Sequence, residues 1–277
     1  MMPGMQSPQP WAAFSVLRLA VALCAMAAAS VCAKPAARLA ATPTFYLKVV
    51  RVYPHDPRAF TQGLLFLDGK LYESTGLYAR SSVRRVDLAS GQVELESKLP
   101  GELFGEGLTQ VGQRLFQLTW KNGKVLVWDL ASLTKEREFS YDGEGWGLCF
   151  DGRHLVMSDG SDKLTLRSPS TFAKEGEINV RLAGRPLGNL NELECVGGAI
   201  FANVWQDNHI ARIDAGSGDV SAWIDATGLL DVNETAGADV LNGIANMPGT
   251  GHLLVTGKLW PHLYEVEVIP AAKAEAR

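Results

Sequence analysis

The sequence predicts an all-β protein, a five-bladed β-propeller with four-stranded antiparallel blades, on three observations. A short phrase recurs five times, turn signals separate β-rich runs after each copy, and helical periodicity is almost absent. The phrase joins a polar or aromatic residue, in most copies a glycine, and an aliphatic residue. Its copies are Gln62–Leu64, Glu106–Leu108, Trp146–Leu148, Asn191–Leu193 and Asn242–Ile244. They begin 44, 40, 45 and 51 positions apart, close to the spacing of about 40 to 50 residues that propeller blades have.

Each copy continues with the same order of strands and turns. A turn such as Asp68-Gly69 leads to a second strand, and a third run such as Val125–Asp129 is followed by another turn and a fourth strand. The last copy stops after Leu263–Val268 without an evident fourth strand, whereas the β-rich segment Phe45–Val52 precedes the first phrase. We therefore expect the N-terminal strand to complete the last blade and close the ring. One propeller domain then spans residues 45–269, with a C-terminal tail at 270–277.

The N-terminus differs in kind from the rest of the chain. After Arg18 the sequence is apolar through Ala29 and reaches Val31-Cys32-Ala33 with small side chains. This pattern predicts a secretory signal peptide at residues 1–33, because the apolar run is too short for a comfortable membrane span. The polar segment 34–44 then forms a flexible mature N-terminus. We expect an exported protein, in the periplasm or outside the cell, without stable membrane insertion.

Bulk composition excludes some partners and leaves the cysteines open. The 277 residues are 47% hydrophobic, with 26 basic and 30 acidic residues and a net charge of -4, so no broad positive field favours nucleic acid. Signal cleavage leaves Cys149 and Cys195, which both lie in buried-strand patterns. A single disulfide is possible in an exported chain, but the usual burial of free cysteine favours two buried thiols.

The repeats place a mixed set of side chains around one mouth of the central channel, because the first strand of each blade lines it. One ring contains Gln62, Glu106, Trp146, Asn191 and Asn242. A second ring, 14 positions further on in four copies and 16 in the fifth, contains Gly76, Trp120, Gly160, Trp205 and Lys258. Phe60 and Phe104, each two residues before a ring position, add aromatic wall.

Aromatic walls with a few convergent polar groups are typical of a small-ligand pocket. Simpler interpretations exist for single members: a tryptophan can pack between blades, Asn191 and Asn242 can bond backbone in turns, and Lys258 can be a solvated loop residue. Glu106 is the strongest candidate for chemistry. Its phrase Phe104-Gly-Glu-Gly107 combines glycines that allow close approach with aromatics that desolvate the acid. The alternative is a buried carboxylate that only accepts backbone hydrogen bonds.

Several phrases together carry a resemblance to a known family. They are Phe60-Thr-Gln-Gly-Leu64, Tyr72-Glu-Ser-Thr-Gly76, Phe104-Gly-Glu-Gly-Leu108, Gly145-Trp-Gly-Leu148, Asn191-Glu-Leu-Glu194, Ala202-Asn-Val-Trp205, Leu241-Asn-Gly-Ile244 and Val255-Thr-Gly-Lys-Leu-Trp260. Over Phe45–Val268 the chain resembles the glutamine cyclotransferase family, the plant and bacterial type of glutaminyl cyclase. The resemblance implies a five-bladed propeller with Glu106 as the catalytic residue. The substrate-binding residues it implies are Phe60, Gln62, Phe104, Trp120, Trp146, Asn191, Trp205 and Lys258.

The resemblance also implies a reaction and its partners. N-terminal glutamine of peptides or proteins would be converted to pyroglutamate with release of ammonia, by a monomer with no metal in the active site and no required cofactor. A calcium ion in the channel, which plant members carry, would be optional and structural. Two alternatives remain: a calcium-dependent lactonase-like hydrolase with Glu106, Asn191 and Asn242 as oxygen ligands, and a peptide-binding propeller without catalysis.

Overall fold

β-Strands carry nearly all the regular structure of residues 41–271, the part of the chain that the computed structural model describes. These residues belong to one unit of the chain, Leu39–Arg277. The predicted signal peptide, most of the 34–44 segment and residues 272–277 lie outside the described residues. A 3-10 helix at Val232–Glu234 interrupts the strands. Within 41–271 no helix is long and apolar enough to cross a membrane.

Three sheets have four antiparallel strands in chain order, and each starts at a repeat phrase. The first contains β2 (Thr61–Leu67), β3 (Lys70–Thr75), β4 (Ser82–Asp87) and β5 (Val93–Lys98). The second contains β6 (Gly105–Val111), β7 (Arg114–Thr119), β8 (Lys124–Asp129) and β9 (Lys135–Ser140). The third contains β10 (Leu148–Phe150), β11 (Leu155–Met157), β12 (Lys163–Arg167) and β13 (Lys174–Asn179). The predicted all-β chain with four-stranded antiparallel sheets is confirmed.

The fourth and fifth repeats share one eight-stranded sheet, in the order β16-β17-β18-β19-β1-β22-β21-β20. Its strands are β16 (Leu190–Val196), β17 (Ala199–Val204), β18 (His209–Asp214), β19 (Val220–Asp225), β1 (Thr44–Pro54), β22 (His262–Pro270), β21 (His252–Gly257) and β20 (Leu241–Met247). β1 pairs antiparallel with β22, as the missing fourth strand of the last repeat predicts. The first residues of β1, Thr44–Tyr46, also pair in parallel with the end of β19. A two-stranded ribbon of β14 (Arg181–Leu182) and β15 (Arg185–Pro186) lies outside these sheets.

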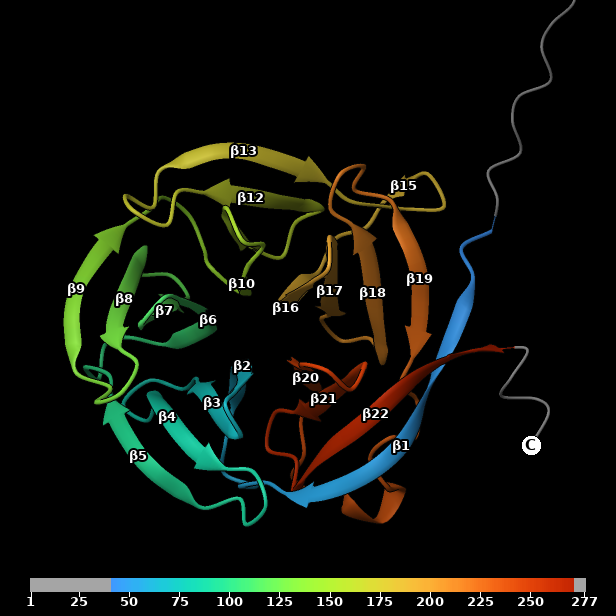
Figure 1. The fold of residues 1–277 in the computed structure, drawn as a ribbon, viewed down its shortest axis with the longest axis horizontal. Helices are drawn as coiled ribbons and strands as arrows, with labels where there is room; N and C mark the ends of the chain where they lie inside the picture. Colours follow the sequence, from blue (N-terminus) through green and yellow to red (C-terminus); the bar gives the residue numbers. More distant parts are fainter. Residues whose placement is uncertain (1–40, 272–277) are drawn as a thin grey trace, which may run out of the picture. The chain divides into compact units, whose positions relative to one another are not determined.

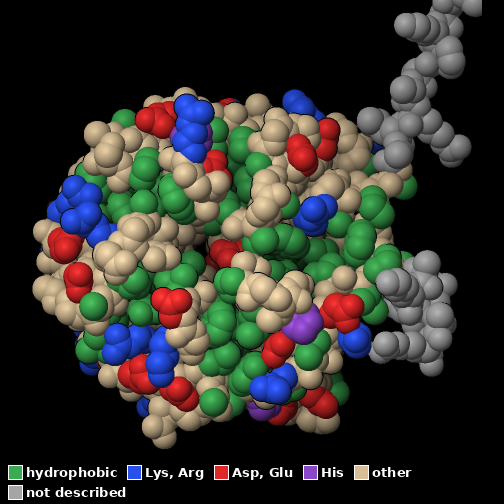
Figure 2. All heavy atoms as spheres, in the orientation of Figure 1, with side chains coloured by type: hydrophobic (Ala, Val, Ile, Leu, Met, Phe, Trp, Pro, Cys, Tyr) green, Lys and Arg blue, Asp and Glu red, His purple; other side chains and the backbone are tan. Residues whose placement is uncertain are grey.

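The first strands of the repeats are innermost in Figure 1, and the sheets lie around them. Burial follows this order: β6 is buried over most of its length, whereas the outer strand β9 is largely exposed. Hydrophobic clusters fill the space between consecutive sheets. Leu65 and Tyr72 of the first sheet, for example, share a cluster with Leu108 and Trp128 of the second. On the face in Figure 2, charged side chains of both signs lie around the periphery and hydrophobic ones gather toward a central hollow.

The glycine of the repeat phrase marks where the innermost strands meet. A Cβ on Gly63 would overlap the backbone of Leu108, and one on Gly107 would overlap the backbone of Leu148. Neighbouring strands can approach this closely only without a side chain at that position. The fourth copy has Glu192 instead, and its carboxylate accepts the amide N–H groups of Leu64 on β2 and Ile244 on β20. This exception replaces close packing with hydrogen bonds across the centre.

The expectation of two buried thiols was wrong, because Cys149 and Cys195 form a disulfide. Cys149 lies on β10 and Cys195 on β16, the innermost strands of two consecutive sheets, with Cα atoms 5.5 Å apart. That separation suits a disulfide without backbone movement. Burial statistics for single cysteines carry no information on this proximity, which follows from how the two repeats pack.

Candidate active site

A cavity of about 500 Å³ opens beside the innermost strands, and all nine residues singled out from the sequence line it. They are Phe60, Gln62, Phe104, Glu106, Trp120, Trp146, Asn191, Trp205 and Lys258. Asn242, the remaining polar member of the first ring, is fully buried and does not line the cavity. Its Nδ2 donates to the Thr61 carbonyl at 2.9 Å and to Gln62 Oε1 at 3.3 Å, so it supports Gln62 from behind.

The constant offset between the two rings has a backbone cause. The N–H of Trp120 donates to the carbonyl of Phe104, and the same bond joins Gly76 to Phe60. Lys258 donates in the same way to Val240, despite the two extra residues in the fifth copy. Trp205 donates likewise to Asn189, so four of the five second-ring residues are tied to the residue two before their first-ring partner; Gly160 is the exception among the described residues. The sequence alignment of the repeats therefore brings seven of the ten ring members to one cavity, all but Asn242, Gly76 and Gly160.

The glycine members of the second ring make room for aromatic walls. A Cβ on Gly76 would overlap the Phe104 ring, and one on Gly160 would overlap the Trp146 indole. The rings pack edge to face: the Phe104 and Trp120 centroids lie 5.5 Å apart, and those of Trp146 and Trp205 lie 5.6 Å apart. Such contacts fix ring orientation as well as burying area.

Glu106 lies on β6 and is only 4% exposed. Its Oε1 accepts a hydrogen bond of 3.0 Å from Gln62 Nε2, whereas Oε2 has no hydrogen-bond partner among residues 41–271. Burial raises the pKa of Glu106 well above its ordinary value, and the positive charge of Lys258 partly offsets this effect. The carboxyl group is thus held by one oxygen, and its raised pKa favours proton uptake more than that of an exposed glutamate.

Lys258 is a buried cation, 5% exposed, without an ion pair among the described residues. Its Nζ lies 4.9 Å from the centroid of the Phe60 ring, a cation–π contact that partly replaces lost hydration. Burial lowers its pKa, and the negative charges of Glu106 and Asp239 oppose that shift. Asn191 is also buried, and its Oδ1 has no hydrogen-bond partner in the described part of the chain. A buried acceptor of this kind is costly unless a ligand or water satisfies it.

Comparison with known proteins identifies the family of this chain. The sequence model of the glutamine cyclotransferase family matches residues 19–268. This chain belongs to that family. It is 45% identical over 232 residues to a glutaminyl-peptide cyclotransferase of Arabidopsis thaliana, a match that spans 82% of this chain and 72% of the relative. The crystal structure of Myxococcus xanthus glutaminyl cyclase superposes with a TM-score of 0.77 at 42% identity, over 83% of this chain and 99% of the other.

Sequence reasoning missed one residue that organises the cyclotransferase cavity, Glu144. Its Oε2 accepts hydrogen bonds from both Trp120 Nε1, at 2.7 Å, and Trp146 Nε1, at 3.0 Å. One carboxylate oxygen thus fixes two tryptophans that belong to different repeats. Glu144 lies two residues before Trp146, the position that Phe60 and Phe104 occupy in the first two repeats. The repeats therefore indicated the position, but an acid there departs from the aromatic pattern, and its role was not recognised. The cavity also includes Leu77, Gln206, Asp239 and Val240, which reasoning from the repeats did not find.

A channel calcium ion, which the family resemblance implies, has no carboxylate site here. Among residues 41–271, no three His, Cys, Asp or Glu side chains are grouped so as to hold a metal ion. Between the innermost strands, the Glu192 oxygens already accept amide N–H groups at 2.8 and 3.3 Å. Because amide N–H donors already face both oxygens of Glu192, this carboxylate does not fit the role of a calcium ligand. We therefore derive no step that involves calcium.

Proposed function

We propose that this protein is a glutaminyl-peptide cyclotransferase, which closes the N-terminal glutamine of peptides or proteins into pyroglutamate and releases ammonia. One observation carries the proposal beyond family membership. A carboxyl group with a raised pKa, Glu106, and a buried cation, Lys258, line the same aromatic cavity. These are the two kinds of group that an internal aminolysis requires.

The reaction forms one C–N bond and breaks another. The neutral α-amine of glutamine attacks the side-chain carbonyl carbon, and the former amide nitrogen leaves as ammonia. Ring closure occurs only from a folded-back conformation of the glutamine side chain. Walls formed by Trp120, Trp146 and Trp205 restrict the bound glutamine to such compact conformations, which lowers the entropic part of the barrier.

Glu106 serves both proton transfers. The attacking nitrogen loses one proton and the leaving nitrogen gains one, so a carboxylate that accepts the first can donate it to the second. The Gln62 hydrogen bond holds Oε1 and leaves Oε2 for the substrate. Burial raises the pKa of Glu106, which makes its protonated state easier to reach than that of an exposed glutamate.

Lys258 is the group best suited to stabilise the oxyanion that develops on the side-chain carbonyl oxygen. It carries a positive charge at a buried site, where electrostatic stabilisation is stronger than in water. Asn191 contributes the unpartnered Oδ1, an acceptor for an N–H group of the substrate. Gln62 is committed to Glu106 and acts by positioning it.

We also propose that residues 45–269 form a closed five-bladed propeller and that the mature protein is exported. Innermost strands contact one another in the cyclic order β2, β6, β10, β16 and β20, which supports five blades and closure. The eight-stranded sheet then contains two blades joined where β1 meets β19. The Cys149–Cys195 disulfide supports export, since disulfides persist mainly in oxidising compartments.

The decisive experiment measures ammonia release by purified protein from a peptide with N-terminal glutamine. The matched control peptide begins with asparagine, which would have to close a strained four-membered ring. We expect ammonia and a pyroglutamyl product, lighter by the mass of ammonia, from the glutaminyl peptide alone. Binding of the glutaminyl peptide without any product would favour the peptide-binding alternative. N-terminal sequencing of exported material tests cleavage before Lys34.

A further inference from the structure

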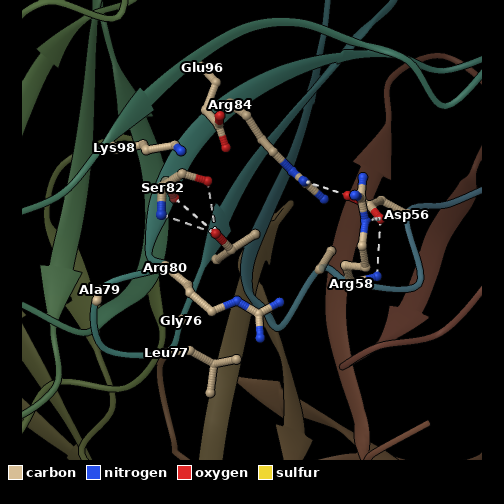
Figure 3. A pocket seen from close by; sticks show the side chains of 12 residues that line it. Asp56, Arg58, Gly76, Leu77, Ala79, Arg80, Ser82, Arg84, Glu96 and Lys98 are labelled. Atoms are coloured by element: carbon tan, nitrogen blue, oxygen red, sulfur yellow. Dashed lines mark hydrogen bonds and ion pairs between the residues drawn. The ribbon is translucent and has the colours of Figure 1, made fainter. Parts of the chain in front are cut away.

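A second cavity, of about 310 Å³, shares a wall with the cyclotransferase cavity (Figure 3). Leu77 lines both cavities. Ala59 faces the second cavity while its neighbour Phe60 faces the first, and Gly76 lines the second cavity beside Leu77. The two spaces are therefore separated by the thickness of two short segments. A chain that leaves the first cavity over Leu77 enters the second.

The second cavity is rich in cationic side chains from several elements. Arg58 comes from the β1–β2 loop, Arg80 from the β3–β4 loop, Arg84 from β4 and Lys98 from the end of β5. Asp56 and Glu96 are the acidic side chains in the lining. In Figure 3, Arg80 lies between Lys98 on one side and Asp56 with Arg58 on the other, and Leu77 lies at the edge of this space.

Two of these cations are already neutralised and two are not. The Arg84 guanidinium pairs with Asp56 at 3.1 Å and with buried Glu73 at 2.8 Å, and Arg58 Nε pairs with Asp56 at 3.1 Å. Arg80 and Lys98 form no ion pair within residues 41–271, and neither does Glu96. The unpaired side chains thus leave a net positive charge in the cavity. Arg84 acts as a buried support rather than as a free cation.

The loop between the cavities has an unusual backbone that keeps this shape. Leu77 and Ala79 have φ angles of 82° and 60°, a region that non-glycine residues rarely adopt. Hydrogen bonds from Ala79 N to the Gly101 carbonyl and from Arg80 N to the Leu77 carbonyl hold the loop. Non-glycine residues in such conformations concentrate at functional sites. Arg80 directly follows this strained turn, and the turn therefore fixes the position of the Arg80 Cα.

We propose that this cavity is a specificity subsite that binds an acidic side chain, Asp or Glu, at the second or third position of the substrate peptide. The proposal rests on the proposed cyclotransferase function, because it requires the N-terminal glutamine in the first cavity. An extended chain advances about 3.3–3.6 Å per residue, so the residues directly after glutamine pass Leu77 and reach Arg80 and Lys98.

The test compares kcat/KM for C-terminally amidated glutaminyl peptides with Glu, Gln or Lys at the second or third position. We expect Glu to exceed Gln by about three- to fivefold and Lys to fall below Gln, the size of effect that partly exposed ion pairs give. A non-amidated neutral peptide shows whether a C-terminal carboxylate is bound in the same way. Arg80→Gln and Lys98→Gln should each reduce the preference, and Arg80→Glu should reverse it. Arg153→Gln, which removes an exposed charge that lines neither cavity, should leave it unchanged.

The outcomes separate the subsite from the activity. Equal kcat/KM for Glu and Gln peptides, with normal ammonia release, would overturn the subsite and leave the cyclotransferase intact. If no peptide releases ammonia, peptide binding followed by tryptophan fluorescence still tests the subsite, because three tryptophans line the first cavity. Tighter binding of the Glu peptide that Arg80→Gln abolishes supports the subsite. Equal binding of all peptides contradicts it.

Discussion

Gln62 Nε2 donates a 3.0 Å hydrogen bond to Glu106 Oε1, and through this bond the first four-stranded sheet positions the carboxyl group of the second. Asn242 in turn donates to Gln62 Oε1 at 3.3 Å. Three first-ring residues from three repeats thus form one chain of hydrogen bonds that ends at the reacting carboxyl. First-ring residues therefore position the Glu106 carboxyl group as well as lining the cavity.

Replacement of Glu106 by glutamine should remove proton transfer while keeping the size of the side chain. We expect kcat for ammonia release to fall by about 100- to 10,000-fold, the usual contribution of a general acid–base group. The melting temperature and peptide binding should remain close to those of the parent. A variant that melts normally and keeps most of its kcat would exclude Glu106 as the proton carrier.

Lys258→Met should act on both the rate and its pH dependence. Loss of the cation removes stabilisation of the oxyanion, so kcat should fall by about 10- to 1,000-fold. The substitution also removes the positive charge that lowers the pKa of Glu106, and the pKa of Glu106 should therefore rise. Because Glu106 must be deprotonated to accept the proton, the ascending limb of kcat/KM should move to higher pH. A reduced kcat without a shift of the ascending limb would mean that Lys258 does not set the pKa of Glu106. An unchanged kcat would mean that Lys258 is only a solvated loop residue.

Glu144→Ala should loosen two cavity walls at once, since Trp120 and Trp146 lose their shared acceptor. We expect kcat/KM to fall by about tenfold, an estimate based on losing two charge-assisted hydrogen bonds at a partly exposed site. Glu144→Gln retains an acceptor oxygen and should recover part of the loss. Glu136→Ala, a control on outer strand β9, should have no effect. Equal activity of Glu144→Ala and the parent would show that the indoles need no shared acceptor.

The sequence predicted the two rings because their spacing is built into the repeat. In four of the five repeats the second-ring N–H donates to the carbonyl of the residue two before the first-ring position, and this bond is kept even in the longer fifth copy. Glu144 and the disulfide escaped prediction for a common reason. Both depend on contacts between repeats, Glu144 with Trp120 and Cys149 with Cys195, and such contacts leave no periodic trace within one repeat.

The pH dependence of stability should report another carboxyl group with a raised pKa, that of half-buried Glu194 on β16. Burial raises its pKa from the ordinary 4.5 to about 8, although the Asn246 N–H partly offsets this. The folded state therefore holds a proton that the unfolded state releases, and stability falls as the pH rises from about 4.5 to 8. Glu194→Gln keeps an acceptor for the Asn246 N–H but cannot ionise. The stability of this variant should therefore fall less between pH 4.5 and 8 than that of the parent. Melting curves of both proteins across that range should converge at low pH and separate above neutrality; parallel curves would contradict the raised pKa.

The Cys149–Cys195 disulfide joins the strands that carry Trp146 and Asn191 just upstream, so its loss should affect both stability and the site. For a sequence separation of 46 residues, loop-closure entropy gives about 4 kcal/mol of stabilisation. We expect the Cys149→Ala/Cys195→Ala double variant to lose stability of this order in urea unfolding, and to bind the glutaminyl peptide more weakly at temperatures where it remains folded. Reduction of the parent should reproduce the change, while a reductant should not affect the double variant. Exported protein should react with a thiol reagent only after reduction. Prompt labelling of both cysteines in the folded, untreated protein would mean that the disulfide does not form in the compartment of the native protein. The disulfide would then no longer support export.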